Sequence, residues 1–423
     1  MVDVTAAPSF EYLGSVPVAS LNLTVHEFRH RVTGAQHYHV AADDPNNVFL
    51  VAFRTVPQDS TGVAHILEHT ALCGSARYPV RDPFFMMTRR SLNTFMNAFT
   101  SSDWTAYPFA SQNRKDYENL LQVYLDAAFF PNLDPLDFAQ EGHRVEFADP
   151  ADPESPLVYK GVVFNEMKGA MSSPVRALWD ALAERLFPTV TYHWNSGGDP
   201  EVIPQLTHDQ LVAFHRTHYH PSNAIFMTYG DIPADQLQQR FEELALQRFE
   251  RQPGRIEVPD EQRFDAPLVA EARYPLAAEE ATGERTHHVL GWLLGRCTDL
   301  ETVLTAHLLN GVLLDNSASP LRDALESSDL GSAPSPLCGL DDSTREMVFA
   351  CGLEGSAPER GAEVEALVLE TLRRVAEEGV DQGLVESMLH QLELSQREIG
   401  GDHFPYGLQL LVNSLNAAVH GGH

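Results

Sequence analysis

The pattern of apolar and polar positions predicts alternating strands and helices in the first half of the chain. Residues 47–57 form an apolar, strand-like run, and a polar stretch leads from it into residues 62–75, whose apolar positions recur at helical spacing. After a loop with prolines, residues 93–111 are rich in aromatic and β-branched side chains with partial alternation, which predicts a strand. Residues 114–130 again show helical spacing.

Three more helices and a strand complete this part. The helices are predicted from helical spacing in YKGVVFNEMKGAM, PVRALWDALAERLF and HDQLVAFHRTHY, and the apolar run NAIFMTYG predicts the strand.

A similar order recurs beyond a polar, proline-bearing linker at residues 251–262. A strand-like segment, a helix, a second strand and two long amphipathic helices follow it. We therefore predict an α+β fold of two related domains, each a mostly antiparallel sheet packed with helices. Residues 1–250 form the first domain, which carries the motif described below, and residues 263–423 form the second, non-catalytic domain.

The composition adds one unusual property, a strongly negative net charge. The formal net charge is −30, and Lys115, Lys160 and Lys168 are the only lysines. So acidic a surface repels phosphate groups, which excludes nucleic acid and anionic membranes as expected partners. It would suit basic peptide substrates, or it would serve solubility alone, and both explanations stay open.

The cellular compartment is predicted from the cysteine pattern and from the absence of a recognisable secretory signal or membrane span. The four cysteines form no CxxC pair, which is typical of a reducing compartment. The N-terminal residues lack the pattern of a secretory signal, and no apolar run is long enough to cross a bilayer. We expect a soluble, cytoplasmic protein.

The predicted helix of residues 62–75 is mostly apolar, but two histidines and a glutamate lie in a stripe on one of its faces. At roughly 100° per residue, His65 and His69 lie one turn apart with Glu68 beside them. Burying such groups without partners costs a few kcal/mol each, and a zinc ion held by both imidazoles would remove that cost. A histidine pair alone is more often a surface or core pair, but H-x-x-E-H is the inverted zincin order, with glutamate as general base.

A catalytic zinc site also needs a third protein ligand. Cys73 continues the stripe, but eight helical residues separate it from His65 by about 12 Å, so a buried apolar role is expected. The cluster HRTHYHP (residues 215–221) has ligand-like spacing but no acidic base, which favours a packing role. Glu166 is the better candidate, because the apolar residues of its predicted helix would pack it beside the first helix.

Three segments make the chain resemble the pitrilysin family of zinc peptidases: GVAHILEHTALCGSARYPVRDPFFMM, SLNTFMNAFTSSDWTAYPFAS and YKGVVFNEMKGAMSSP. They are most similar to the presequence protease branch, and the resemblance extends from about residue 20 to the end. It implies that His65, His69 and Glu166 bind one zinc ion and that Glu68 is the base that activates zinc-bound water.

The resemblance also implies a substrate site on an edge strand. Asn97, Ala98 and Phe99 would belong to a strand that receives an extended peptide as an added strand. Other branches of the family carry an extra glutamate seven positions before the third ligand, where this chain has Tyr159. If that glutamate orients the ligands, its role must fall to other residues here.

Members of the branch are clamshells of two halves, each with two related domains, around a closed peptide chamber. The chain corresponds to one half, so we expect it to need a second, supplied by a missing C-terminal half, a partner chain or a homodimer. The expected function is a zinc-dependent endopeptidase for short, unfolded peptides. The alternatives are a non-catalytic assembly or scaffold subunit, which the intact motif argues against, and a metal-storage module, which would not need Glu68.

Overall fold

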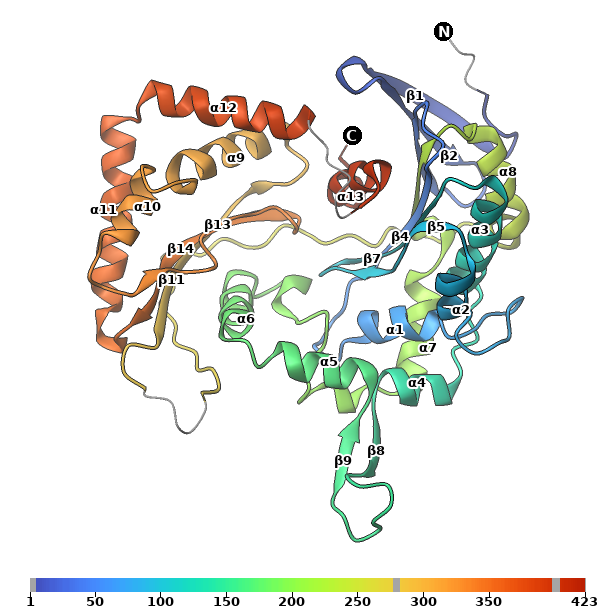
Figure 1. Cartoon of the computed structure of the whole chain (residues 1–423), viewed down its shortest axis with the longest axis horizontal. Helices are drawn as coiled ribbons and strands as arrows, with labels where there is room; N and C mark the ends of the chain where they lie inside the picture. The colour runs from blue at the N-terminus through green and yellow to red at the C-terminus, as the bar shows by residue number, and fades with distance from the viewer. Residues whose placement is uncertain (1–4, 277–281, 398–403, 423) are drawn as a thin grey trace. The chain divides into compact units, whose positions relative to one another are not determined.

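The computed structural model describes residues 5–276, 282–397 and 404–422, which form two compact units (Figure 1). Unit 1 comprises the described residues of Met1–Gly169, Trp194–Val258 and Ile399–Val419. Unit 2 comprises those of Ala170–His193, Pro259–Glu398 and His420–His423. Both units are therefore discontinuous in sequence.

Unit 1 is built on one eight-stranded sheet with the strand order β1-β2-β3-β10-β4-β7-β5, and β6 also pairs with β7. Its neighbours pair antiparallel except β3 and β10, which run parallel. The strands are β1 (Phe10–Val18), β2 (Leu23–His30), β3 (Gln36–Ala41), β4 (Asn47–Arg54), β5 (Asn93–Met96), β6 (Phe99–Thr100), β7 (Trp104–Ser111) and β10 (Ala224–Gly230).

Strand β4 is buried on both faces because apolar side chains point alternately to two cores. Phe49, Val51 and Phe53 enter the core beneath most of the helices, whereas Leu50 and Ala52 enter the core on the opposite face. The helices of unit 1 are α1 (Val63–Ala71), α2 (Pro83–Arg90), α3 (Arg114–Phe129), α4 (Pro135–Glu141), α5 (Val162–Ala170), α7 (His208–His218), α8 (Ala234–Leu244) and α13 (Tyr406–Val419).

Helix α13 supplies buried residues to the second core, although it follows the strands of unit 2 in sequence. Its Leu408, Leu411 and Leu415 are fully buried there. The buried Arg54 at the end of β4 donates from Nε to the carbonyl of Val419 at 2.7 Å. A buried guanidinium thus satisfies a carbonyl at the C-terminal end of α13.

A two-stranded hairpin, β8 (Arg144–Phe147) and β9 (Leu157–Lys160), projects from unit 1 between α4 and α5 (Figure 1). Its strand register places four apolar side chains on one face, and all four are exposed: Val145, Phe147, Leu157 and Tyr159. On the other face, Glu146 pairs with both Arg144 and Lys160.

Unit 2 has a smaller antiparallel sheet in the order β11-β14-β12, with β13 also paired to β14. Its core includes Leu321, Cys351, Leu353 and Val364. The elements are β11 (Thr286–Arg296), β12 (Ala333–Pro334), β13 (Gly339–Asp341), β14 (Glu346–Ser356), α6 (Pro174–Leu186), α9 (Leu300–Leu314), α10 (Pro320–Glu326), α11 (Gly361–Glu378) and α12 (Gln382–Arg397).

Short 3₁₀ helices complete the fold: η1 (Ala19–Leu21), η2 (Thr191–His193), η3 (Ile203–Gln205), η4 (Pro221–Asn223), η5 (Leu246–Arg248) and η6 (Pro358–Arg360). Among the described residues, no helix combines the length and hydropathy that crossing a bilayer requires.

The predicted α+β fold with antiparallel-rich sheets is confirmed. Two details differ. Residues 93–111 form three strands rather than one, because Asn97 and Ala98 separate β5 from β6 and a turn at residues 101–103 reverses the chain into β7, which pairs with both. The units also differ from the continuous domains 1–250 and 263–423, because residues 170–193 belong to unit 2 and α13 packs against the sheet of unit 1.

Candidate metal centre

Helix α1 places its polar stripe at the edge of the core. Six of its side chains are buried: Val63, Ala64, Ile66, Leu67, Thr70 and Ala71. His65, Glu68 and His69 stay partly exposed on the remaining face. The two imidazole rings lie 5.0 Å apart between centroids, as one helical turn requires.

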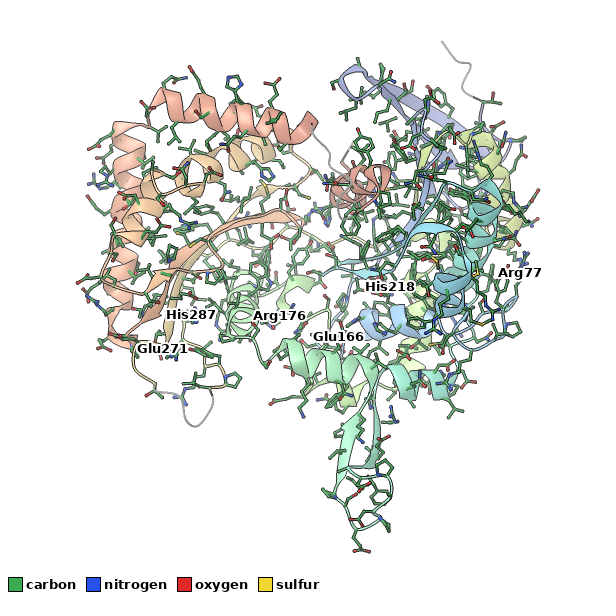
Figure 2. All side chains as sticks on the ribbon, in the orientation of Figure 1. Arg77, Glu166, Arg176, His218, Glu271 and His287 are labelled. Carbon is green, nitrogen blue, oxygen red and sulfur yellow. The ribbon has the colours of Figure 1, made fainter. Side chains whose placement is uncertain are left out.

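Helix α5 brings Glu166 to this stripe. The helix buries Val163, Phe164 and Met167, which leaves Glu166 on the side facing α1 (Figure 2). His65 Nε2 and Glu166 Oε2 are 3.9 Å apart. One ligand atom from each of His65, His69 and Glu166 lies within 4.8 Å of the others. Among the described residues, this is the group of histidine, cysteine and carboxylate side chains that could hold a metal ion.

The Nδ1 atoms of both histidines are engaged on the side away from the centre. His69 Nδ1 lies 3.1 Å from Glu141 Oε2, and His65 Nδ1 lies 3.0 Å from the carbonyl of Gly197. These contacts fix each ring and direct Nε2 inward, as outer partners of metal-binding histidines do. Burial lowers the pKa of His69, but the hydrogen bond to Glu141 and the surrounding carboxylates outweigh burial and raise it overall.

The Gly197 carbonyl is held at His65 by a close backbone contact. Gly62, at the start of α1, has φ +70°, and a Cβ there would lie 2.8 Å from Gly197 O and 2.8 Å from Gly198 Cα. Only glycine fits this approach. The loop that begins at Trp194 is thereby packed against the first turn of the motif helix.

Glu68 contacts the edge of the sheet. Thr100 on β6 donates a hydrogen bond from Oγ1 to Glu68 Oε2. Burial raises the pKa of Glu68, and the Thr100 hydrogen bond and both histidines offset part of that rise. The carboxylate therefore lies between the proposed ligands and the edge strands.

The residues predicted for substrate binding lie at this edge. Asn97 donates its backbone N–H to Pro108 O at 3.2 Å, Ala98 is buried, and Phe99 pairs with Ala106 of β7. In the described part of the chain, β5 and β6 pair with β7 and with no further strand. Their role in binding peptide stays a prediction.

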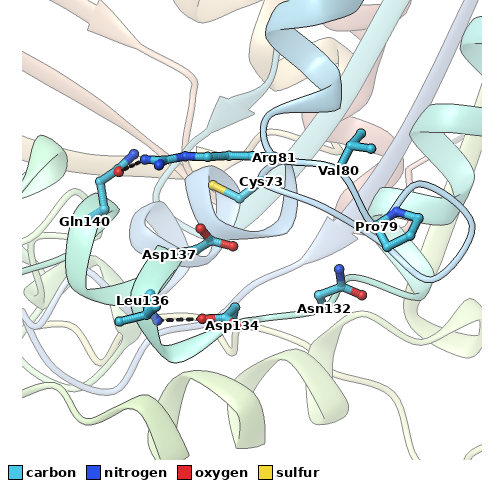
Figure 3. Close-up of a pocket in the computed structure, with 9 residues that line it drawn as sticks. All are labelled: Cys73, Pro79, Val80, Arg81, Asn132, Asp134, Leu136, Asp137 and Gln140. Atoms are coloured by element: carbon cyan, nitrogen blue, oxygen red, sulfur yellow. Dashed lines mark hydrogen bonds between the residues drawn. The ribbon is translucent and has the colours of Figure 1, made fainter.

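The other candidates have structural partners. His215 Nε2 and His218 Nδ1 contact backbone carbonyls at 3.0 and 2.9 Å, and His220 Nδ1 accepts from the N–H of Ser222. Cys73 is buried and donates from Sγ to His69 O. It lines a cavity of about 350 Å³ together with Arg81, Asp134, Asp137 and Gln140, among others (Figure 3).

Burial and the nearby carboxylates raise the pKa of the Cys73 thiol far above its usual range. Its burial and its contact with the His69 carbonyl agree with the expected apolar packing role.

Sequence reasoning missed Glu141 and Gly197. Both contact the histidines from distant segments, and no local pattern marks them. The absent family glutamate, replaced by Tyr159 on the hairpin, was the one indication that other residues must orient the ligands.

Comparison with known proteins gave two family models and many relatives. Residues 54–151 match "Insulinase (Peptidase family M16)", and residues 205–392 match "Peptidase M16 inactive domain". The mitochondrial presequence protease of Danio rerio is 47% identical over 382 residues, which cover 90% of this chain and 37% of that protein. Presequence protease 1 of Arabidopsis thaliana, chloroplastic/mitochondrial, is 42% identical and covers 92% of this chain and 36% of its own length.

Solved structures show the same fold. Pitrilysin has a TM-score of 0.66 at 17% identity, covering 97% of this chain and 42% of pitrilysin. A protease from Helicobacter pylori has a TM-score of 0.64 at 17% identity, covering 97% of this chain and 90% of the other. The chain thus spans well under half the length of the curated relatives it matches.

The predicted cytoplasmic location is wrong. The relatives are named as mitochondrial, or chloroplastic and mitochondrial, presequence proteases, which points to an organelle. Unpaired cysteines separate reducing from oxidising compartments, but they do not distinguish one reducing compartment from another.

Proposed function

The chain belongs to the M16 family of peptidases, and from this membership we propose that it carries the zinc-dependent active site of an endopeptidase for short, unfolded peptides. One observation carries the proposal. The ligand atoms of His65, His69 and Glu166 converge within 4.8 Å, with Glu68 beside them. The scaffold-subunit alternative is not favoured, because such a subunit would not need this convergence.

The donor set fits zinc. Two imidazole nitrogens and one carboxylate oxygen form a typical catalytic zinc set, which leaves a fourth position open. The three ligand atoms lie within 4.8 Å of one another, and His65 Nε2 is 3.9 Å from Glu166 Oε2, so side-chain shifts would bring all three onto one ion. When bound there, zinc would supply a Lewis acid that polarises a peptide carbonyl and acidifies water.

The protein side chains would then divide the remaining work. Glu68 takes a proton from the attacking water and passes it to the leaving amine. Glu141 and the Gly197 carbonyl hold the rings of His69 and His65 in the orientation that presents Nε2.

The edge strands β5 and β6 are the proposed peptide-binding element. A peptide added beside them would be held through its backbone, independently of its side chains. Thr100 of β6 contacts Glu68, so such a peptide would pass next to the proposed base. Asn97, Ala98 and Phe99 belong to this edge. Basic peptides would gain from the net charge of −30.

Full activity is proposed to need further protein. The curated relatives extend well beyond the matched region, and donors for the developing oxyanion can come from there. The part of the chain that matches the family's inactive domain includes most of unit 2, in keeping with a non-catalytic role for that unit.

The test combines metal content with peptide turnover. We expect about one zinc per chain by elemental analysis. A fluorogenic unfolded peptide should be cleaved slowly, cleavage should stop after chelation and zinc should restore it. Adding the remaining portion of a relative as a separate chain should raise turnover at least tenfold. A chain that binds no zinc, or one whose peptide cleavage survives chelation, would contradict the proposal.

A further inference from the structure

The hairpin β8–β9 leaves and rejoins unit 1 at a contact between two glycines, Gly142 and Gly161. A Cβ on Gly161 would lie 2.0 Å from the carbonyl oxygen of Gly142, 2.6 Å from its carbonyl carbon and 3.0 Å from His143 Cα. All three atoms belong to the backbone, so no side-chain rotation can relieve the clash. Gly161 does not have a positive φ, and therefore space rather than backbone conformation requires glycine there.

Gly142 also touches the helix that carries the two histidines. A Cβ at this position would lie 3.0 Å from Cγ2 of Ile66, a fully buried residue of α1, and 2.9 Å from Phe138 O. The glycine is therefore packed between α1 on one side and Gly161 on the other. Three segments meet at this point: α1, the end of α4 and the start of α5.

Backbone hydrogen bonds fix both helix ends at the same contact. Gly142 N–H donates to Phe138 O at 2.8 Å and closes the last turn of α4. Gly161 O accepts from Asn165 N–H at 3.0 Å and opens the first turn of α5. Glu141 precedes the first glycine and contacts His69 Nδ1, whereas Glu166 lies five residues after the second and faces His65 Nε2.

We propose that Gly142 and Gly161 are positioning residues of the metal centre. Their contact sets the distance between α4 and α5, and thereby places Glu141 and Glu166 on opposite sides of the two histidines. This inference rests on the proposed metal function. It adds that the base of the hairpin determines metal affinity without any of its residues touching the ion.

The test is Gly161→Ala, with Gly169→Ala as matched control. Gly169 lies on α5, the helix that directly follows Gly161, and a Cβ there meets nothing within 4 Å. Cobalt(II) is the probe, because its visible spectrum reports ligand geometry and its titration gives affinity. We expect Gly161→Ala to weaken cobalt binding at least tenfold and to change the spectrum, while Gly169→Ala behaves as the parent. Thermal unfolding of the metal-free proteins measures any general loss of stability.

A lower midpoint of metal-free unfolding with unchanged cobalt affinity and spectrum would show a merely structural glycine and overturn the inference. If Gly161→Ala does not fold, Gly142→Ala, with its milder contacts of 2.9 and 3.0 Å, is read in the same way.

A double-mutant cycle tests the route of the effect. If the glycine contact acts through Glu141, the loss caused by Glu141→Gln should be at least threefold smaller in the Gly161→Ala background than in the parent. Equal losses in both backgrounds would contradict the placement of Glu141 by the glycine contact and leave the metal site itself intact. A parent chain that binds neither zinc nor cobalt would instead overturn the proposed function and this inference together.

Discussion

Helices α1 and α9 each follow a long strand of their sheet and each contain a histidine followed by two apolar residues, HILEH in α1 and HLLNG in α9. In each helix a histidine also contacts a carboxylate. His69 lies 3.1 Å from Glu141, and His307 Nε2 lies 3.0 Å from Asp342 Oδ2. Hydrogen bonding to Asp342 raises the pKa of His307, just as the carboxylates raise that of His69.

The difference lies in what surrounds the pair. On α1 a second imidazole stands one turn away, and carboxylates arrive from both α4 and α5. On α9 the corresponding positions are Asn310 and Gly311, and the pair of His307 and Asp342 is part-exposed. A histidine–carboxylate pair is therefore not a metal site by itself, since surface pairs of this kind are common and weak. The histidines of α1 differ from His307 because side chains from three helices, α1, α4 and α5, meet there.

The largest expected effect concerns the base. Glu68→Gln removes the proton acceptor but keeps the shape and all three ligands. Peptide turnover should fall by roughly a hundred- to ten-thousandfold while zinc content stays at the parent level. Glu301→Gln, at an exposed carboxylate of α9, is the control and should change neither quantity. Parental turnover by Glu68→Gln would refute the assigned role.

The next effect compares the two histidines directly. His69→Ala removes a ligand, so zinc affinity measured by competition with a chelating dye should fall at least about a hundredfold. His307→Ala leaves the ligand set unchanged and should bind zinc as the parent does. If both variants keep full zinc affinity, the metal lies elsewhere, and the comparison between the helices loses its basis.

A smaller effect concerns the carboxylate partners. Glu141→Gln keeps a hydrogen bond to His69 but removes its charge, and loss of such outer partners costs about ten- to a hundredfold in metal affinity. Asp342→Asn makes the same change beside His307 and should leave zinc binding unaltered. Equal zinc affinities for Glu141→Gln and the parent would show that Glu141 does not support the ligand.

The smallest effect concerns acid stability away from the metal centre. His37 and His39 are buried in β3, and both rings contact Thr228 Oγ1, at 2.9 and 2.8 Å. Burial, together with the nearby His26, lowers the pKa of His39 to about 3, and burial lowers that of His37 well below its usual value. In the unfolded chain both imidazoles take up a proton as the pH falls below about 6.5. In the folded protein they stay neutral over most of this range.

The free energy of unfolding should therefore be highest above pH 6.5 and decrease as the pH falls from there toward 3. Thermal unfolding of His39→Asn should show a flatter decrease over this range than the parent. The exposed His390→Asn should show the parental decrease. If stability decreased equally with falling pH in all three proteins, protonation of these buried rings would not destabilise the fold.

The residues of the centre that could be predicted from spacing alone lie close to one another in the sequence. His65, Glu68 and His69 fall on one stripe because helical geometry alone relates them. Glu166 was reached through its predicted helix and the family resemblance. Glu141 and Gly197 could not be predicted, because their contacts depend on how distant segments pack.

The same limit applies to the fold. Strands β4, β7, β10, β11 and β14 were predicted from their apolar or aromatic-rich runs, whereas β1, β2 and β3 were not predicted. The place of α13 could not be predicted either, since an amphipathic helix can cover either sheet. Arg54 and Val419, which fix it to unit 1, are separated by 365 positions.

The position of α13 has a consequence for the order of events during synthesis. The last strand of the large sheet, β10, ends at Gly230, and α13 begins at Tyr406. At about 5–20 residues per second, a ribosome needs on the order of ten to forty seconds to pass from one to the other. For that time Leu50, Ala52, Ile225 and Met227 lack the helix that covers them. During this time the nascent chain exposes an apolar sheet face that chaperones can bind. The residues of the proposed metal centre have by then already been synthesised.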